Sequence, residues 1–316
     1  HIRGRMVSLN QLTIVLGISM AYYSNYFLLA IGENAWRWMF AAEAVPSLLF
    51  FVALFIVPES PRWLVARNNE SEAAKILDKV GGSDFANNAL EEIKESFKGN
   101  EKRGTLKDAF RKKYSIILFL GIFIAVFQQW SGINVIFFYG PEIFKNANLE
   151  IDTALYYTTL VGLMNIVFTL VAMRVIDKMG RKNLMLIGAA GMTVCYLVIG
   201  YLFQIGRTED WMLLTFIILT PAFFFFCFGP TVWVVLSEMF PNKIRGAAMS
   251  VATFSLWVAC YILTLTFPIF VEQFNQANTF WIYAVICLIG FIIIYKLLPE
   301  TKGVTLEKLE KMLVKE

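Results

Sequence analysis

Three amide side chains stand close together in a stretch of sequence that is otherwise apolar and aromatic. The string FQQWSGINVIFFYG at residues 127–140 contains Gln128, Gln129 and Asn134. A buried amide without a hydrogen-bond partner costs about 1–3 kcal/mol, so polar groups must meet these three side chains. An amide both donates and accepts hydrogen bonds, as the hydroxyl group of a sugar does. The residues therefore predict either hydrogen bonding between helices or a site for a polar, uncharged ligand.

A Ser-Gly pair between these amides suggests how one helix could present all of them. Successive helical residues are turned by about 100°, so Gln128 and Gln129 are neighbours on the helix surface, whereas Asn134 lies on another face. A break at Ser131-Gly132 would bring the three amides together. Discontinuous helices often carry the substrate sites of membrane transporters. We therefore expect a broken helix here.

The composition indicates that these residues belong to a membrane protein. Of the 316 residues, 58% are hydrophobic and 16% are charged, whereas about 25% are charged in soluble domains. A membrane-spanning helix needs about 20 apolar residues, and eight such runs predict eight spans. They lie at about 7–31, 38–57, 114–140, 154–175, 184–205, 211–237, 247–271 and 279–297.

The distribution of basic residues predicts the orientation of these spans. Of the 28 Lys and Arg residues, only Arg37, Lys145 and Arg207 fall in loops on one side. Cytoplasmic loops carry the excess of basic residues, so both ends of this chain are expected in the cytoplasm. The expected parts are two spans at 1–57, a cytoplasmic helical linker at 58–113, six spans at 114–298 and a cytoplasmic tail at 299–316.

Two recurring strings indicate an internal repeat. IRG occurs at 2–4 and at 244–246, and PES at 58–60 is echoed by PET at 299–301. Repeats of several spans build the two halves of many transporters. Four spans precede the second IRG after the linker, so we expect four further spans ahead of the first IRG in a complete protein.

Further polar and aromatic side chains inside the spans favour a neutral, polyhydroxylated ligand. Amides and flat aromatic rings suit sugar hydroxyl groups and C–H faces, whereas an anion would call for basic residues in the spans. No enzyme, cofactor, metal or nucleic-acid motif accompanies them, and the four cysteines are expected to be core residues. The residues of this kind are Gln11, Asn25, Asn165, Trp233 and Trp257.

Glu43 is the one ionisable residue that lies well inside a predicted span. A charged group at this depth is costly and often marks the path of an ion or a proton. The alternative is a carboxylate near the outer interface that water reaches and that Arg37 neutralises.

Six motifs resemble those of the sugar porters of the major facilitator superfamily, over essentially the whole chain. They are RGRMVSLNQ, VPESPRWL, QQWSGIN, DKMGRK, GPTVWVVLSEMFPNKIRG and LPETKG. Bacterial xylose–proton symporters are the most similar group, and glucose facilitators are more distant. The resemblance implies an all-α membrane protein with eight of twelve transmembrane helices present. It also implies two six-helix halves that rock around a central sugar site.

The resemblance also implies roles for particular residues. Substrate contacts are expected from Gln11, Gln128, Gln129, Asn134, Asn165, Trp233 and Trp257. Phe138 and Tyr139 match an aromatic gate, and Glu43 matches an acid of the proton-coupled members. A cytoplasmic charge network is expected from Arg3, Glu59, Arg62, Asp177, Arg181, Glu238 and Arg245.

Two positions depart from the xylose symporters, because Ile18 and Leu256 replace glutamines that contact the sugar in that group. The expected ligand is therefore a pentose, a hexose or a cyclic polyol. The expected activity is sugar:proton symport across a bacterial cytoplasmic membrane. An uncoupled facilitator and a transporter-like sugar receptor are the alternatives.

Overall fold

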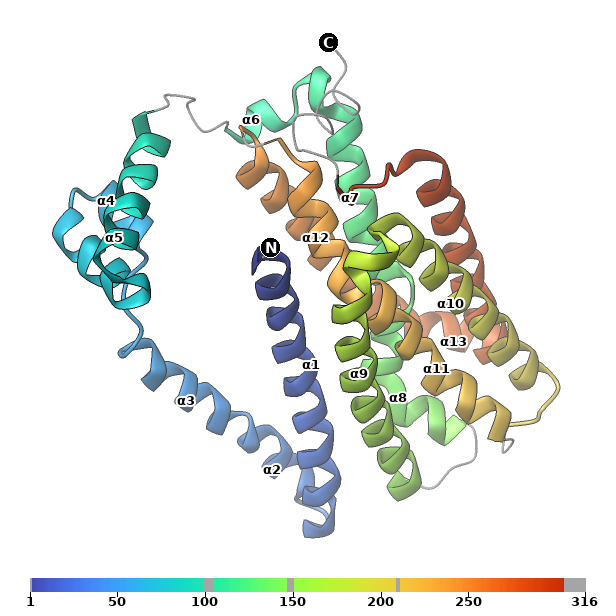
Figure 1. Cartoon of the computed structure of the whole chain (residues 1–316). Coiled ribbons are helices and arrows are strands. Elements are labelled where there is room, and N and C mark those ends of the chain that lie inside the picture. Colours follow the sequence, from blue (N-terminus) through green and yellow to red (C-terminus); the bar gives the residue numbers. More distant parts are fainter. Residues whose placement is uncertain (1, 99–104, 147–150, 209–210, 242, 304–316) are drawn as a thin grey trace. The chain divides into compact units, whose positions relative to one another are not determined.

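The computed structural model describes residues 2–98, 105–146, 151–208, 211–241 and 243–303 (Figure 1). Every regular element in these ranges is a helix, which confirms the predicted all-α class. The chain divides into two compact units. Unit 1 comprises His1–Ala30 and Gly104–Glu316, and unit 2 comprises Ile31–Arg103.

Seven helical stretches of the described chain are long and apolar enough to cross a membrane, compared with the eight predicted spans. They are Gln11–Ile31, Ala35–Leu54, Lys112–Lys145, Leu155–Ile176, Arg181–Gln204, Trp211–Met239 and Arg245–Leu297. The last stretch contains 53 residues, and its backbone leaves helical geometry at Asn275 (φ 66, ψ 170). A straight helix of that length would be about 80 Å long, more than twice the thickness of a bilayer core. The two predicted runs at 247–271 and 279–297 lie on either side of this break, so the difference in number arises at Asn275.

Unit 1 contains two helix pairs that are each interrupted by a short break. α7 (Ser115–Trp130) precedes α8 (Ile133–Asn146), and α11 (Trp211–Cys227) precedes α12 (Gly229–Met239). The other elements of unit 1 are α1 (Ile2–Leu28), α6 (Leu106–Ala109), η2 (Lys112–Tyr114), α9 (Ile151–Met179), α10 (Arg181–Gln204) and α13 (Arg245–Leu297), and η1 (Leu29–Ile31) lies at the boundary between the units.

Close helix contacts position α7 for the site described below. α13 packs mainly against α10 and α7, and α1 packs mainly against α9. A methyl group added to Gly290 of α13 would lie 2.1 Å from the ring of Phe127 on α7. Glycine therefore permits an approach that a larger residue would prevent, as is common between membrane helices.

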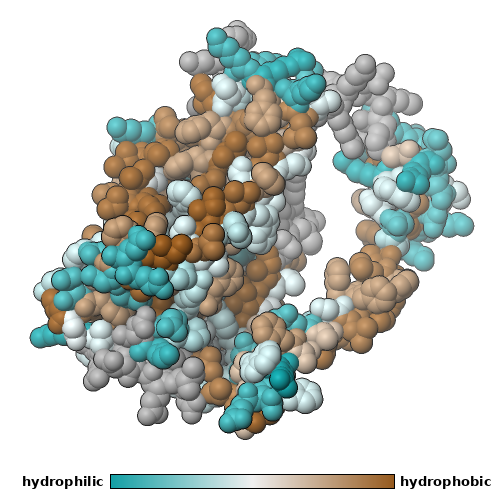
Figure 2. All heavy atoms as spheres, turned by 180° about the vertical axis from the view of Figure 1, so that it is seen from behind, coloured by the Kyte–Doolittle hydropathy of each residue, from teal (hydrophilic) through white to brown (hydrophobic). Residues whose placement is uncertain are grey.

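Large apolar side chains remain exposed on the outer surface of unit 1. Figure 2 shows hydrophobic residues over much of one face of these helices. α10 exposes Val194, Leu197 and Tyr201, and α13 exposes Leu288 and Ile289. Lipid would cover such a surface in a membrane.

Unit 2 combines apolar helices with a small helical cluster. α2 (Ala35–Ala42) and α3 (Ala44–Leu54) precede α4 (Pro61–Ala66) and α5 (Glu70–Lys98). The string ESPRWL predicts a helix that begins at Pro61 and is capped by Ser60. α4 begins at Pro61, but the Ser60 side chain makes no capping hydrogen bond. The residues that pack α4 against α5 are Leu64, Val65, Ala73, Leu77, Ala86 and Ile93.

The strings EAAKILDKV and ALEEIKESF predict two amphipathic helices, and α5 contains both. Gly82 has φ 82 and ψ 174, a conformation that glycine adopts without steric cost. The direction of the chain changes there, so the two predicted segments form the two arms of α5.

Candidate functional site

The helix that carries the amide cluster is broken where the sequence predicts. α7 ends at Trp130 and α8 begins at Ile133. Gly132 has φ +85, and a methyl group added there would lie 2.8 Å from Tyr196 Oη and 3.0 Å from the ring of Tyr283. Both the backbone conformation and the lack of space therefore require glycine at this break.

The break brings Asn134 of α8 back to Gln129 of α7. Asn134 Nδ2 donates hydrogen bonds to Gln129 Oε1 and, at 3.3 Å, to Cys260 Sγ on α13. Gln128 and Gln129 are 5% and 9% exposed, so these amides lie in the protein interior. With both Nδ2 hydrogens used, Asn134 Oδ1 can still accept and Gln129 Nε2 can still donate.

Gln11 lies beside the second broken helix pair. Its side chain is buried on α1, and a methyl group added to Gly229 would lie 3.1 Å from Gln11 Nε2. Gly229 begins α12, which also carries the partly buried Trp233. Predicted ligand residues therefore lie at both breaks, with Gln11 near α11–α12 and with Gln129 and Asn134 at α7–α8.

Asn165 is fully buried in α9, and neither of its amide atoms has a hydrogen-bond partner within the described ranges. A buried amide in this state costs about 1–3 kcal/mol, so a polar group from a ligand or from water would stabilise it. Asn165 therefore forms no hydrogen bond with the described amides of α7 and α8.

Trp257 lies on α13, and the two predicted gate residues, Phe138 and Tyr139, lie on α8. Trp257 is 64% exposed and precedes Cys260 by almost one turn, so it shares a face with the thiol that contacts Asn134. Tyr139 Oη donates to the carbonyl oxygen of Thr264 at 2.9 Å, and its ring lies 4.9 Å from the ring of Phe267. Phe138 is 58% exposed.

A cavity of about 560 Å³ lies between α8 and α13 and adjoins Phe138 and Tyr139. Its lining includes Phe138, Tyr139 and Phe267, together with the polar groups of Glu142, Glu272 and Gln276. The aromatic pair therefore forms part of a cavity wall.

Glu43 lies at the junction between α2 and α3 in unit 2, and its side chain is exposed. Its carbonyl oxygen accepts a hydrogen bond from Ser47 Oγ at 2.8 Å. Arg37, the partner that the sequence suggested, has its guanidinium 5.2 Å above the ring of Trp36.

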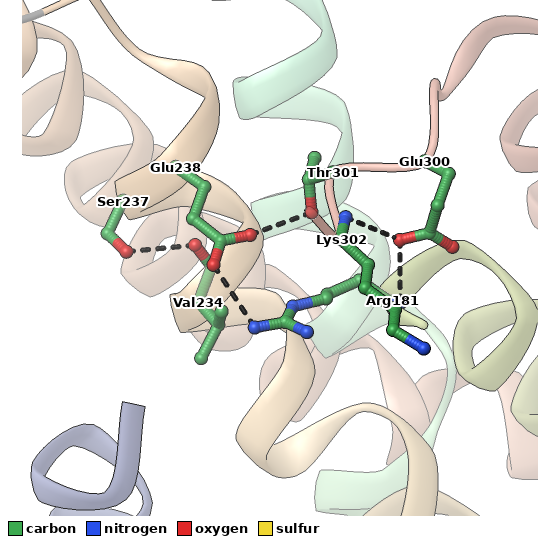
Figure 3. A network of polar contacts seen from close by, with 7 residues as sticks. All are labelled: Arg181, Val234, Ser237, Glu238, Glu300, Thr301 and Lys302. Carbon is green, nitrogen blue, oxygen red and sulfur yellow. Dashed lines mark hydrogen bonds and ion pairs between the residues drawn. The ribbon is translucent and has the colours of Figure 1, made fainter. Parts of the chain in front are cut away.

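One ion pair of the predicted charge network forms at the end of α12 (Figure 3). Arg181 Nη2 lies 3.2 Å from Glu238 Oε1, and their side chains are 11% and 29% exposed. Arg245 Nε donates to the carbonyl oxygen of Phe240 at 3.1 Å.

The remaining members of the predicted network are Arg3, Asp177, Glu59 and Arg62. The side chains of Arg3 and Asp177 lie outside the described residues. Glu59 and Arg62 are exposed in unit 2.

Glu300 completes the cluster, although the sequence analysis did not assign it a role. Its carboxylate accepts hydrogen bonds from the backbone amides of Arg181 at 3.0 Å and Lys302 at 2.9 Å (Figure 3). It also accepts one from the backbone amide of Lys182 at 3.2 Å. Thr301 Oγ1 also donates to Glu238 Oε2 at 2.7 Å. A carboxylate at the N-terminus of α10 satisfies amides that have no partner within the helix. The string PET at 299–301, which echoes PES at 58–60, is the sequence feature that could have indicated Glu300.

Cys260 is the second residue that sequence reasoning missed. All four cysteines are buried and free, as predicted, yet Cys260 also contacts an amide of the candidate site.

Comparison with known proteins extends these observations. The profile of a family described as "Sugar (and other) transporter" matches residues 1–313. The D-xylose-proton symporter of Escherichia coli K12 is 39% identical over 99% of this chain and 65% of its own length. The arabinose-proton symporter of Bacillus subtilis is 39% identical over 99% of this chain and 69% of its own length. The glucose facilitated diffusion protein of Zymomonas mobilis is 35% identical over 98% of this chain and 67% of its own length.

Solved structures show the same architecture. A structure of a major facilitator superfamily proton:xylose symporter bound to 6-bromo-6-deoxy-D-glucose matches with a TM-score of 0.81 and 38% identity, over 99% of this chain and 68% of the other. An inward-open structure of the E. coli xylose transporter matches with a TM-score of 0.82 and 36% identity, over 99% of this chain and 66% of the other. This chain therefore spans about two thirds of the length of these relatives.

Proposed function

Because this chain belongs to the sugar transporters of the major facilitator superfamily, we propose that it carries a neutral monosaccharide across a bacterial cytoplasmic membrane together with a proton. The mechanism is alternating access, in which the two halves of the protein rock around the sugar. The linker and both ends of the chain lie on the cytoplasmic side. The transported sugar is a pentose, a hexose or a cyclic polyol.

The observation that carries this proposal is the amide pair at the break between α7 and α8. The bond from Asn134 to Gln129 leaves the Asn134 side-chain oxygen able to accept a hydrogen bond and the Gln129 side-chain nitrogen able to donate one. A sugar hydroxyl donates and accepts at once, so it can bond both groups. Gln128 and Gln11 add further amides in the interior of the same unit.

We expect Gln129→Ala to weaken sugar binding about three- to tenfold, because one hydrogen bond contributes roughly 0.5–1.5 kcal/mol. Calorimetric titration of the purified full-length gene product with D-xylose, L-arabinose and D-glucose would measure this loss. Gln204→Ala removes the same amide from an exposed position at the end of α10 and should leave affinity unchanged. Unchanged affinity for Gln129→Ala with a lower thermal midpoint would favour the packing interpretation.

Proton coupling depends on a separate residue in this proposal. Glu43 is a carboxylate within a span-length stretch of unit 2, and carboxylates at such positions tend to mark proton paths. Relatives of similar identity include both symporters and a facilitated diffusion protein, so an uncoupled facilitator is the second candidate function.

We expect Glu43→Gln to impair sugar accumulation driven by a pH gradient while sugar exchange continues, because glutamine has no proton to release. Proteoliposomes that contain the full-length gene product allow both measurements. Glu33→Gln changes an exposed carboxylate just before α2 and should alter neither rate. Full accumulation by Glu43→Gln would contradict the coupling role.

A further inference from the structure

Two helices near the candidate gate contain prolines that release backbone carbonyl groups. Pro141 lies inside α8 and Pro268 lies inside α13. Proline has no amide hydrogen and its ring displaces the carbonyl four residues earlier, so that carbonyl loses its helical partner. The released groups are therefore the carbonyls of Phe137 and Thr264.

A tyrosine hydroxyl from another helix reaches each of these released carbonyls. Tyr139 Oη of α8 donates to the Thr264 carbonyl oxygen at 2.9 Å, and Tyr22 Oη of α1 donates to the Phe137 carbonyl oxygen at 3.3 Å. The first distance is typical of a good O–H···O bond, and the second is longer. The two bonds link α1 to α8 and α8 to α13 in series.

Packing holds both tyrosines in these positions. The ring of Tyr139 lies 4.9 Å from the ring of Phe267, which immediately precedes Pro268. Ser19, almost one turn before Tyr22, donates to the Gly162 carbonyl oxygen of α9 at 2.8 Å. A methyl group added to Gly162 would lie 3.1 Å from the Tyr22 ring, so α1 can approach α9 closely there.

We infer that Tyr139 and Tyr22 are positioning residues, whose hydroxyls fix the outer part of α8 by bonding carbonyls that Pro268 and Pro141 release. This inference rests on the proposed function, in which Phe138 and Tyr139 form the gate. Tyr139 contributes its ring to the gate and its hydroxyl to the attachment. The part of α8 that carries Phe138 and Tyr139 can move away from α13 only when the Tyr139 hydroxyl breaks its bond to the Thr264 carbonyl oxygen. Movement of α8 is therefore coupled to bending of α13 at Pro268.

The decisive experiment is a double-substitution cycle on the full-length gene product. Tyr139→Phe keeps the ring but removes the hydroxyl, and backbone amides of residues 137–145 should exchange hydrogen about three- to tenfold faster, as expected for loss of one hydrogen bond. Pro268→Ala restores an amide that can bond the Thr264 carbonyl. In that background, Tyr139→Phe should have little further effect on exchange. Tyr23→Phe removes a hydroxyl from an exposed neighbour on α1 and should change nothing.

Two results would overturn the inference. One is equal acceleration by Tyr139→Phe with and without Pro268→Ala, because the hydroxyl would then act on some other group. The other is no acceleration in either background. The cycle of Tyr22→Phe with Pro141→Ala tests the second attachment by the same comparison, and it remains informative if Pro268→Ala fails to fold. Hydrogen exchange is measured without sugar, so these results test the two attachments independently of whether the protein transports a sugar.

Discussion

Replacing Gly132 by alanine is expected to destabilise the protein by about 2–5 kcal/mol and to abolish measurable sugar binding. A residue with a Cβ atom at positive φ costs about 1–2 kcal/mol, and Gly132 has φ +85. The new methyl group would also overlap Tyr196 Oη at 2.8 Å and the Tyr283 ring at 3.0 Å, and overpacking adds about 1–3 kcal/mol. Gln129 and Asn134 stand on either side of this position, so any shift of the break separates them. Thermal unfolding in detergent and calorimetric titration with sugar would measure both effects.

Two other glycines separate the contributions to this effect. Gly206 has φ +71 with no atom near its added methyl group, whereas Gly246 has neither positive φ nor a close neighbour. Gly206→Ala should therefore show the backbone cost alone, and Gly246→Ala should show almost none. If Gly132→Ala lowers stability no more than Gly206→Ala does, the expected steric overlap with Tyr196 and Tyr283 does not occur.

A second substitution tests which neighbour causes the overlap. Tyr196 Oη is buried and has no hydrogen-bond partner among the described groups, so Tyr196→Phe alone should cost little. It removes the atom nearest to the added methyl group and should recover part of the stability that Gly132→Ala loses. No recovery would assign the overlap to Tyr283.

The sequence was sufficient to predict features that depend on local pattern. Apolar runs predicted the spans, and a Ser-Gly pair inside one run predicted the break between α7 and α8. Local pattern also predicted two amphipathic segments in α5, which the backbone conformation of Gly82 separates. These predictions succeeded because hydrophobic length and glycine conformation act within a few residues of chain.

Contacts between distant segments could not be predicted in this way. Cys260 has the apolar neighbours of a core residue, and nothing near it in sequence indicates that its thiol meets Asn134, 126 residues away. The pairing of Tyr139 with Thr264, 125 residues away, is likewise visible only in the folded chain. Each requires the packing of α13 against α7 and α8, which periodicity does not specify.

The hydrogen bonds from the start of α10 to Glu300 are a third contact between segments that are distant in sequence. Their loss should lower the stability of the protein substantially. We expect Glu300→Ala to lower the free energy of unfolding by about 1–3 kcal/mol, because a hydrogen bond to a charged group makes a net contribution of about 1.5–3 kcal/mol. The Arg181 and Lys182 amides would lose their acceptor at the start of α10. Chemical denaturation of the full-length gene product, followed by tryptophan fluorescence, would measure the change.

The same substitution tests whether this cluster maintains one conformation of the protein. Arg181 bonds Glu238 through its side chain and Glu300 through its backbone, so loss of Glu300 should loosen the Arg181–Glu238 pair and speed hydrogen exchange at the start of α10. Glu300→Gln keeps an acceptor oxygen without the charge and should lie between wild type and Glu300→Ala. Glu92→Ala removes an exposed carboxylate from α5 and should leave the start of α10 unchanged. Equal exchange in Glu300→Ala and wild type would mean that water replaces the carboxylate there, and Glu300 would then have no role in holding α10 against α12.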